Sequence, residues 1–157
     1  MSTYIISDTH FFDENIINFC NRPFSDIFSM NEFMIEKWNE IVGENDETYI
    51  VGDFAISNKE KIKEILSKLN GKKYLIIGNH DTYSVQEYIH MGFAKVYDFP
   101  IILDEFWILS HNPMFMNETM PYVNIFGHIH NSPLYKDYSK QHFCGCGRCP
   151  NELHTDR

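Results

Sequence analysis

The stretch TYIISDTH, residues 3–10, is a short apolar run that ends in an aspartate and a histidine. Two further runs have the same form, ETYIVGD at residues 47–53 and KYLIIGN at residues 73–79. Strands that are apolar along nearly their whole length are typical of a sheet covered on both faces. We therefore expect these three segments to lie in one buried sheet.

The segments between these strands have the spacing of helices. Residues 30–42 repeat apolar side chains at helical intervals, and Gly43 follows as the expected C-cap. Residues 57–71 contain a second apolar stripe, with Ser57 and Glu60 placed as a capping box. The order strand, helix, strand, helix, strand predicts right-handed crossovers between parallel strands.

The second half of the chain has a different character. After a short helix expected around residues 84–91, apolar runs follow with short connections at residues 94–103, 105–111 and 122–128. This pattern predicts a second, more antiparallel sheet. The fold class we expect is therefore α/β, with two stacked sheets.

The composition is that of one folded domain. The chain has 157 residues, enough for a single hydrophobic core, and its longest apolar runs are far shorter than a membrane span. The residues before Asp8 do not form a charged and apolar leader, so we expect a cytoplasmic protein with reduced thiols. The net charge of −9 disfavours extended nucleic acid and anionic membranes as partners.

Polar residues follow the ends of the expected strands. In open α/β folds the carboxyl ends of strands line the crevice where ligands bind. Seven of these residues offer carboxylate, amide or imidazole donors, which suits manganese, iron, zinc, nickel or cobalt better than calcium. Seven ligands exceed the need of one ion and favour two. Each motif alone is typical of a turn, but together they predict a metal site built from Asp8, His10, Asp53, Asn79, His111, His128 and His130.

The order of these motifs resembles the signature of the calcineurin-like metallophosphoesterases, especially small bacterial and phage single-domain members. The resemblance covers about residues 1–140 and implies a four-layer αββα sandwich, two stacked mixed sheets flanked by helices, with a dinuclear site at the strand ends. The matching blocks are Asp8-Thr9-His10, Gly52-Asp53, Gly78-Asn79-His80-Asp81, His111 and Gly127-His128-Ile129-His130.

The resemblance also implies roles for the site residues. One ion would be held by Asp8, His10 and His130, the other by Asn79, His111 and His128, with Asp53 bridging. His80 is similar to the family's general acid, which suits histidine because its imidazole titrates near neutral pH. Asp81 would orient that imidazole, or else cap the following helix.

The activity implied is hydrolysis of a small phosphodiester or phosphomonoester by in-line attack of a metal-bridging hydroxide, with manganese favoured among the divalent ions. The alternative is a non-catalytic metal-binding scaffold of the same fold. A small phosphate ester is then the expected partner, and a homodimer remains open.

A weaker similarity to one bacterial and phage subgroup lies between residues 12 and 24. Asn15 and the run Arg22-Pro23-Phe24 match, whereas Phe12-Asp13 stands where that subgroup has Gly-His. The match implies that Arg22 and Asn15 bind substrate. The alternative for Arg22 is a surface residue packed beside Pro23, and Cys20 is expected to be a small buried side chain.

The chain ends in an atypical segment, which we separate as residues 144–157 from a phosphoesterase domain at residues 1–143. One interpretation of its C-x-C-x-x-C pattern, which has histidines nearby, is a structural zinc site. Under that interpretation the protein would be a zinc-dependent nucleic-acid binder. A frameshift near residues 144–145 is another, because a shifted frame can encode Val-Glu-Asp-Ala-Arg-Met-Asn-Tyr-Thr-Pro-Ile. That sequence is similar to the closing strand and Tyr-Pro segment usual in the family.

Overall fold

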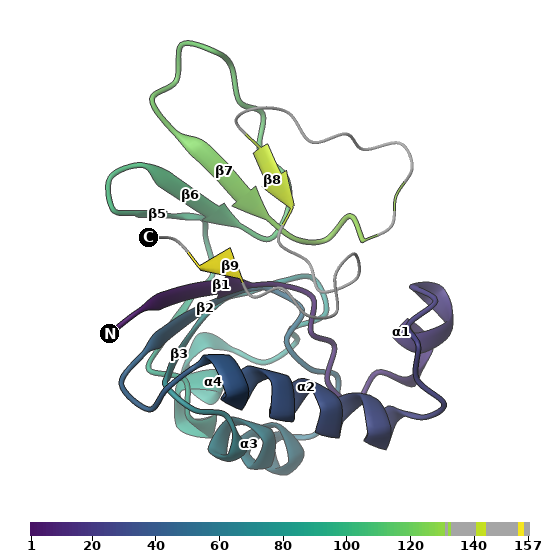
Figure 1. The fold of residues 1–157 in the computed structure, drawn as a ribbon. Helices are drawn as coiled ribbons and strands as arrows, with labels where there is room; N and C mark the ends of the chain where they lie inside the picture. Colours follow the sequence, from purple (N-terminus) through teal and green to yellow (C-terminus); the bar gives the residue numbers. More distant parts are fainter. Residues whose placement is uncertain (131, 133–140, 144–153, 156–157) are drawn as a thin grey trace.

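The first sheet contains the three apolar segments. This computed structural model, which describes residues 1–130, 132, 141–143 and 154–155, stacks two sheets face to face (Figure 1). The strands of the first are β1 (Thr3–Ile6), β2 (Glu47–Val51), β3 (Lys72–Ile76), β4 (Lys95–Tyr97) and β9 (His154–Thr155), in the order β4-β3-β2-β1-β9. Strands β1 to β4 are parallel, and β9 runs antiparallel to β1. The predicted buried parallel sheet is therefore confirmed.

Three helices cover the outer face of the first sheet (Figure 1). They are α2 (Ile27–Ile41), α3 (Lys59–Lys68) and α4 (Val85–Met91). Their apolar sides pack on the sheet in one core cluster, in which Trp38 and Ile62 are buried. A second cluster fills the space between the two sheets. Because both faces of the first sheet are buried, its strands read as continuous apolar runs.

The helix ends differ in detail from the predicted ones. The N-cap of α3 is Asn58, whose side chain accepts the Lys61 N–H, so the capping box predicted at Ser57 and Glu60 is wrong. The C-cap of α2 is Val42 rather than Gly43. Both helix ends differ from the predicted ones by one residue. The cap preference of a single polar residue or glycine does not fix a helix end more closely than that.

The second sheet is more parallel than predicted. Its strands are β5 (Ile101–Leu103), β6 (Trp107–Ser110), β7 (Val123–Phe126) and β8 (Gln141–Phe143), in that order. Only β5 and β6 pair in antiparallel fashion, whereas β6, β7 and β8 are parallel. The reason is the connection at residues 111–122, which returns the chain so that β7 enters beside β6 in the same direction. Strand β4, also predicted for this sheet, joins the first one instead.

The α/β class with two stacked sheets and flanking helices is confirmed. On the outer face of the second sheet, the described residues place a loop where the four-layer arrangement has helices. Asn124 points away from the core that contains Ile125, and its Oδ1 accepts the N–H of Met114 from this loop at 2.8 Å. A short helix, α1 (Glu14–Phe19), was not predicted and lies beside the strand ends (Figure 1).

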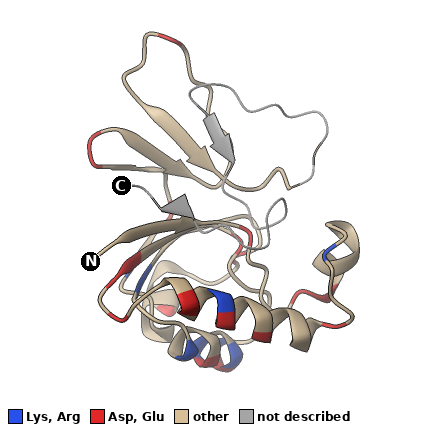
Figure 2. Cartoon of the chain, viewed as in Figure 1, with Lys and Arg blue, Asp and Glu red and all other residues tan. Residues whose placement is uncertain are grey.

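The surface charge is unevenly distributed. Lysine, arginine and acidic residues gather on the helices, and the strands of the second sheet carry few (Figure 2). Within the described part of the chain, none of the helices is long and apolar enough to cross a membrane.

Candidate metal centre

The seven predicted ligands converge at the carboxyl ends of five strands. Asp8 and His10 follow β1, and Asp53 follows β2. The remaining ligands follow β3, β6 and β7, and two of the seven, Asn79 and His128, are exposed. The others are nearly or fully buried. The topology therefore places polar donors in a buried position that would be costly for isolated polar groups.

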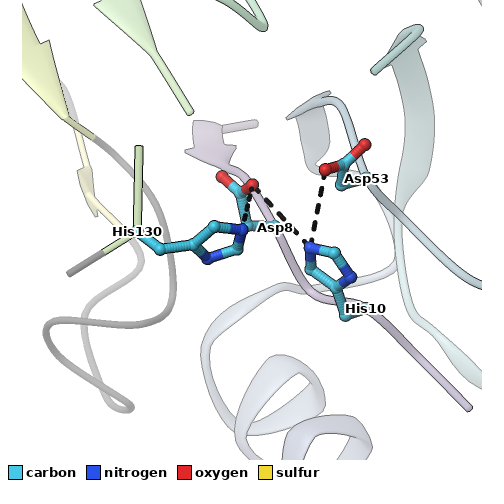
Figure 3. Close-up of side chains that lie close together, drawn as sticks. All are labelled: Asp8, His10, Asp53 and His130. Carbon is cyan, nitrogen blue, oxygen red and sulfur yellow. Dashed lines mark ion pairs between the residues drawn. The ribbon is translucent and has the colours of Figure 1, made fainter. Parts of the chain in front are cut away.

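The first donor group contains two carboxylates and two imidazoles (Figure 3). One ligand atom from each of Asp8, His10, Asp53 and His130 lies within 4.8 Å of the others. His10 Nε2 is 3.5 Å from Asp53 Oδ2, and His130 Nε2 is 3.5 Å from Asp8 Oδ1. His10 Nε2 is buried and has no hydrogen-bond partner among the described residues. An unpartnered ring nitrogen between two carboxylates fits a bound cation.

The second donor group adjoins the first. Asn79 Oδ1 lies 2.9 Å from His111 Nε2 and 2.8 Å from His128 Nδ1. His111 Nε2 is also 3.3 Å from Asp53 Oδ2. The same Asp53 oxygen therefore faces ligands of both groups. The mixed oxygen and nitrogen donors suit borderline divalent ions.

Burial prepares these groups for a cation. It raises the pKa of Asp8 to about 6, although the hydrogen bond from Ser7 opposes the shift. Burial lowers the pKa of His10 to about 4, and burial with the charge of Arg22 does the same for His130. Neutral imidazoles keep a lone pair free for a metal, and a cation would offset the cost of the buried carboxylate charge.

The backbone at the ligand positions is strained. Left-handed φ values between 45° and 69° occur at five ligands, namely Asp8, His10, Asp53, His128 and His130. Non-glycine residues adopt this region at a cost, and such positions cluster at functional sites. Two motif glycines allow the close packing. A Cβ at Gly127 would collide with the Asp8 carboxylate, and one at Gly52 with the His111 ring.

Asp13 supports the first donor group in a way that the sequence analysis missed. Its Oδ2 lies 3.1 Å from His10 Nδ1, and its Oδ1 accepts the Asn15 N–H as the N-cap of α1. A carboxylate on Nδ1 selects the tautomer that leaves Nε2 free for a metal. The signal was present, because Asp13 lies three positions after His10 and aspartate is a favoured residue at helix N-caps. Phe12 has a φ of 65°, a conformation that glycine adopts most easily.

Asp81 ties two ligand loops together. Its carboxylate accepts the N–H groups of Asp53 and Gly78 at 2.8 Å each and that of Phe54 at 3.0 Å. Burial raises its pKa to about 6, while the bond from Gly78 opposes the shift. The helix-capping alternative is wrong, because Ser84 is the N-cap of α4. Orientation of the neighbouring imidazole by Asp81 remains a prediction.

His80 lies at the entrance of the site. Its side chain is exposed, and its ring centroid is 5.3 Å from that of His10. Its backbone N–H donates to Asp53 Oδ1 at 2.9 Å. The backbone therefore belongs to the metal loop, whereas the imidazole faces a cavity of about 610 Å³ that His10, Asp53 and His128 also line. Asn15 lines the same cavity, and its role in substrate binding remains a prediction.

Arg22 is a buried residue of the first ligand loop. The surface alternative is wrong, because only 9% of the residue is exposed. Its guanidinium donates to the carbonyl oxygens of Asp8 at 2.7 Å and Thr9 at 2.9 Å. These bonds point into the protein, and Arg22 is not among the described residues that line the cavity. The structure therefore shows Arg22 bonded to the ligand loop, and its contact with substrate remains a prediction.

We expect Arg22→Met to destabilise the protein without a direct effect on substrate affinity. Loss of the guanidinium leaves two buried carbonyl groups without these donors, which should lower the free energy of unfolding by about 2–4 kcal/mol. Urea unfolding of the metal-free protein measures this loss. Lys37→Met, at a surface pair with Glu40, is the matched control and should stay within about 0.5 kcal/mol. A raised KM with unchanged unfolding would instead assign Arg22 to substrate.

Cys20 is buried, as predicted, and its Sγ lies 3.4 Å from His130 Nδ1. The other three cysteines, Cys144, Cys146 and Cys149, lie outside the described residues, as do the side chains of His142 and His154. The zinc and frameshift interpretations, and the boundary at residue 143, therefore remain predictions.

Comparison with known proteins identifies the family. The profile of the calcineurin-like phosphoesterases matches residues 1–148. The uncharacterized protein MJ1445 of Methanocaldococcus jannaschii is 36% identical over 131 residues, which cover 77% of this chain and 74% of the relative. Gene 66 protein of Mycobacterium phage L5 is 30% identical over 83 residues, which cover 51% of this chain and 40% of the relative.

Two solved structures have the same fold. The Aquifex aeolicus protein AQ665, of unknown function, superposes with a TM-score of 0.76 at 26% identity, covering 98% of this chain and 95% of that chain. The Pseudomonas putida nuclease MPE superposes with a TM-score of 0.56 at 21% identity, covering 82% of this chain and 61% of that chain. With the family profile matching almost the whole described chain, the protein belongs to the calcineurin-like phosphoesterase family.

Proposed function

We propose that the protein hydrolyses a small phosphate ester with two divalent ions, manganese being favoured. The observation that carries the proposal is the position of Asp53 Oδ2, which faces His10 of the first donor group at 3.5 Å and His111 of the second at 3.3 Å. A carboxylate shared in this way is what a pair of ions a few ångströms apart requires. Membership of a phosphoesterase family supports the reaction type.

The residues divide the work of the reaction. Bound ions would supply an activated water and draw charge from the non-bridging phosphate oxygens. Asp8, His10 and His130 would hold one ion, and Asn79, His111 and His128 the other. His80 lines the cavity outside both donor groups, where its imidazole can give a proton to the leaving oxygen. Asp81 keeps the loops of Asp53 and Asn79 in register through its three backbone hydrogen bonds.

A phosphodiester is the favoured ester, and a cytoplasmic location is expected. The name of the Pseudomonas putida nuclease supports diester chemistry, since nucleases cleave phosphodiesters. The scaffold alternative has no specific support, because each donor that the family uses is present. We keep the homodimer as a prediction.

Metal removal tests the proposal. Chelator-treated protein should be inactive toward bis(p-nitrophenyl) phosphate and p-nitrophenyl phosphate, and added Mn²⁺ should restore hydrolysis with two ions bound per chain. Elemental analysis and release of p-nitrophenolate measure the two quantities. Two bound ions without hydrolysis would favour the scaffold. One bound zinc without hydrolysis would favour a zinc site in residues 144–157.

A further inference from the structure

Phe19 is an exposed aromatic residue at the edge of the metal site. It is the last residue of α1, and 76% of it is exposed. Its ring centroid lies 5.9 Å from that of His130, with the two rings at 86° to each other. A single exposed phenylalanine is ordinary on a protein surface. This one stands out because it lies within ring-contact distance of a metal ligand.

The cavity beside Phe19 is lined by two kinds of side chain. Donors of both metal groups line it, and so do the apolar residues Ile16, Phe19 and Ile56. Ile56 is 40% exposed and comes from the loop after β2, so helix α1 and this loop present apolar side chains to the same space. A phosphate held by the metal donors would therefore have apolar surface within the same cavity for one of its ester groups. Phenylalanine offers a flat face on which a planar ring stacks.

Apart from the metal ions that the proposed function requires, the side chains of the cavity favour a diester over a monoester. Its described lining contains the carboxylates Asp13 and Asp53 and neither lysine nor arginine. Lysine and arginine lie mainly on the helices that cover the far side of the first sheet (Figure 2). A diester carries one negative charge, whereas a monoester carries close to two at neutral pH. The net charge of −9 also opposes a long polyanion.

We infer that the substrate is a nucleotide-sized phosphodiester and that Phe19 stacks on its nucleobase. This inference rests on the proposed phosphoesterase activity and adds a specificity-determining residue and a substrate class to it. Stacking selects for a planar base without reading its identity, because each base has a π-face. The site would therefore discriminate between ester groups by flatness rather than by hydrogen bonds.

Two esters with the same leaving group test the role of Phe19. Thymidine 5′-(p-nitrophenyl phosphate) and methyl p-nitrophenyl phosphate both release p-nitrophenolate and differ in the group that remains on phosphorus. Phe19→Ala should lower kcat/KM for the thymidine ester about 10-fold and change that for the methyl ester by less than about 2-fold. Phe19→Tyr should retain the wild-type preference, since it keeps the ring.

Binding supplies a readout that does not depend on turnover. With Mn²⁺ present, Phe19→Ala should weaken the affinity for adenosine 5′-monophosphate about 10-fold and leave that for ribose 5-phosphate, which lacks the base, unchanged. Calorimetry measures both, and the Mn²⁺ stoichiometry should equal that of the wild type. Phe28→Ala is the matched control, because Phe28 is 72% exposed on α2 and is not among the described residues of the cavity.

The outcomes separate this inference from the proposed function. Equal loss with both esters, or no loss with either, together with unchanged affinity for adenosine 5′-monophosphate, would overturn base stacking while hydrolysis itself stands. If the wild type cleaves neither of these esters and is also inactive toward bis(p-nitrophenyl) phosphate and p-nitrophenyl phosphate, the proposed function fails. In that case a selective loss of adenosine 5′-monophosphate binding in Phe19→Ala would still support a base-stacking site.

Discussion

Asp53→Asn should abolish metal binding and hydrolysis together. The Oδ2 atom of Asp53 faces His10 Nε2 and His111 Nε2, and no other carboxylate of the described donors is placed between both groups. Burial opposes ionisation of Asp53, yet the hydrogen bond and charge of His111 hold its pKa below the usual range. The charge that a pair of cations needs is therefore already present. A neutral amide removes that charge and leaves one oxygen.

The loss of metal affinity in Asp53→Asn should exceed the roughly 10- to 100-fold drop that follows removal of a residue hydrogen-bonded to a metal ligand. Titration calorimetry with Mn²⁺ measures the affinity, and hydrolysis of bis(p-nitrophenyl) phosphate measures the activity. The fold should survive, because an asparagine Oδ1 can still accept the His80 N–H, and circular dichroism checks this. Asp98→Asn, at an exposed aspartate between β4 and β5, is the control. Wild-type activity in Asp53→Asn would contradict the bridging role that we propose for Asp53.

The first sheet could be predicted because a strand that is buried on both faces requires a nearly continuous apolar run in the sequence. Strands β1, β2 and β3 are apolar toward their carboxyl ends, although β3 begins with Lys72 and Lys73, and the helices between them have clear periodicity. The direction of β7 could not be predicted in the same way. The connection before it lacks helical periodicity, so local sequence does not distinguish a hairpin from a crossover.

The ligand set could be predicted because the residues that end parallel strands must meet at one edge of the sheet. The roles of Arg22 and Asp81 could not. Where a long arginine side chain goes depends on how the chain packs around it, and here it turns inward to the carbonyls of Asp8 and Thr9. Asp81 was expected to orient an imidazole or cap a helix, yet its carboxylate accepts backbone N–H groups, two from the Asp53 loop and one from its own loop.

The helix α1 was missed because six residues are too few to show a helical period. The consequence is functional, since α1 carries Phe19 to the rim of the cavity. Asp13 both caps this helix and contacts His10, so the position of the rim and the orientation of one metal ligand depend on the same carboxylate.

His80→Ala should keep both metals and slow the reaction according to the leaving group. The His80 imidazole is exposed and belongs to neither donor group, and an alanine retains the backbone N–H that donates to Asp53. Loss of a positioned general acid costs typically 10²- to 10⁴-fold when the leaving oxygen needs a proton. p-Nitrophenolate leaves readily without one. We therefore expect kcat for an alkyl ester to fall by about 10³-fold and kcat for a p-nitrophenyl ester to fall by about 10-fold or less.

The contrast between leaving groups separates proton donation from other roles of the same residue. If His80 only positioned the phosphate, both esters would slow by the same factor, because the contact would not depend on the basicity of the leaving oxygen. If His80 were a metal ligand, His80→Ala would weaken Mn²⁺ binding, as we expect for Asp53→Asn. His90→Ala, at an exposed histidine on α4 that is not among the described residues of the cavity, controls for loss of a surface imidazole. Proton donation is assigned to His80 only if both metals are retained and the fold-loss in kcat grows with the basicity of the leaving oxygen.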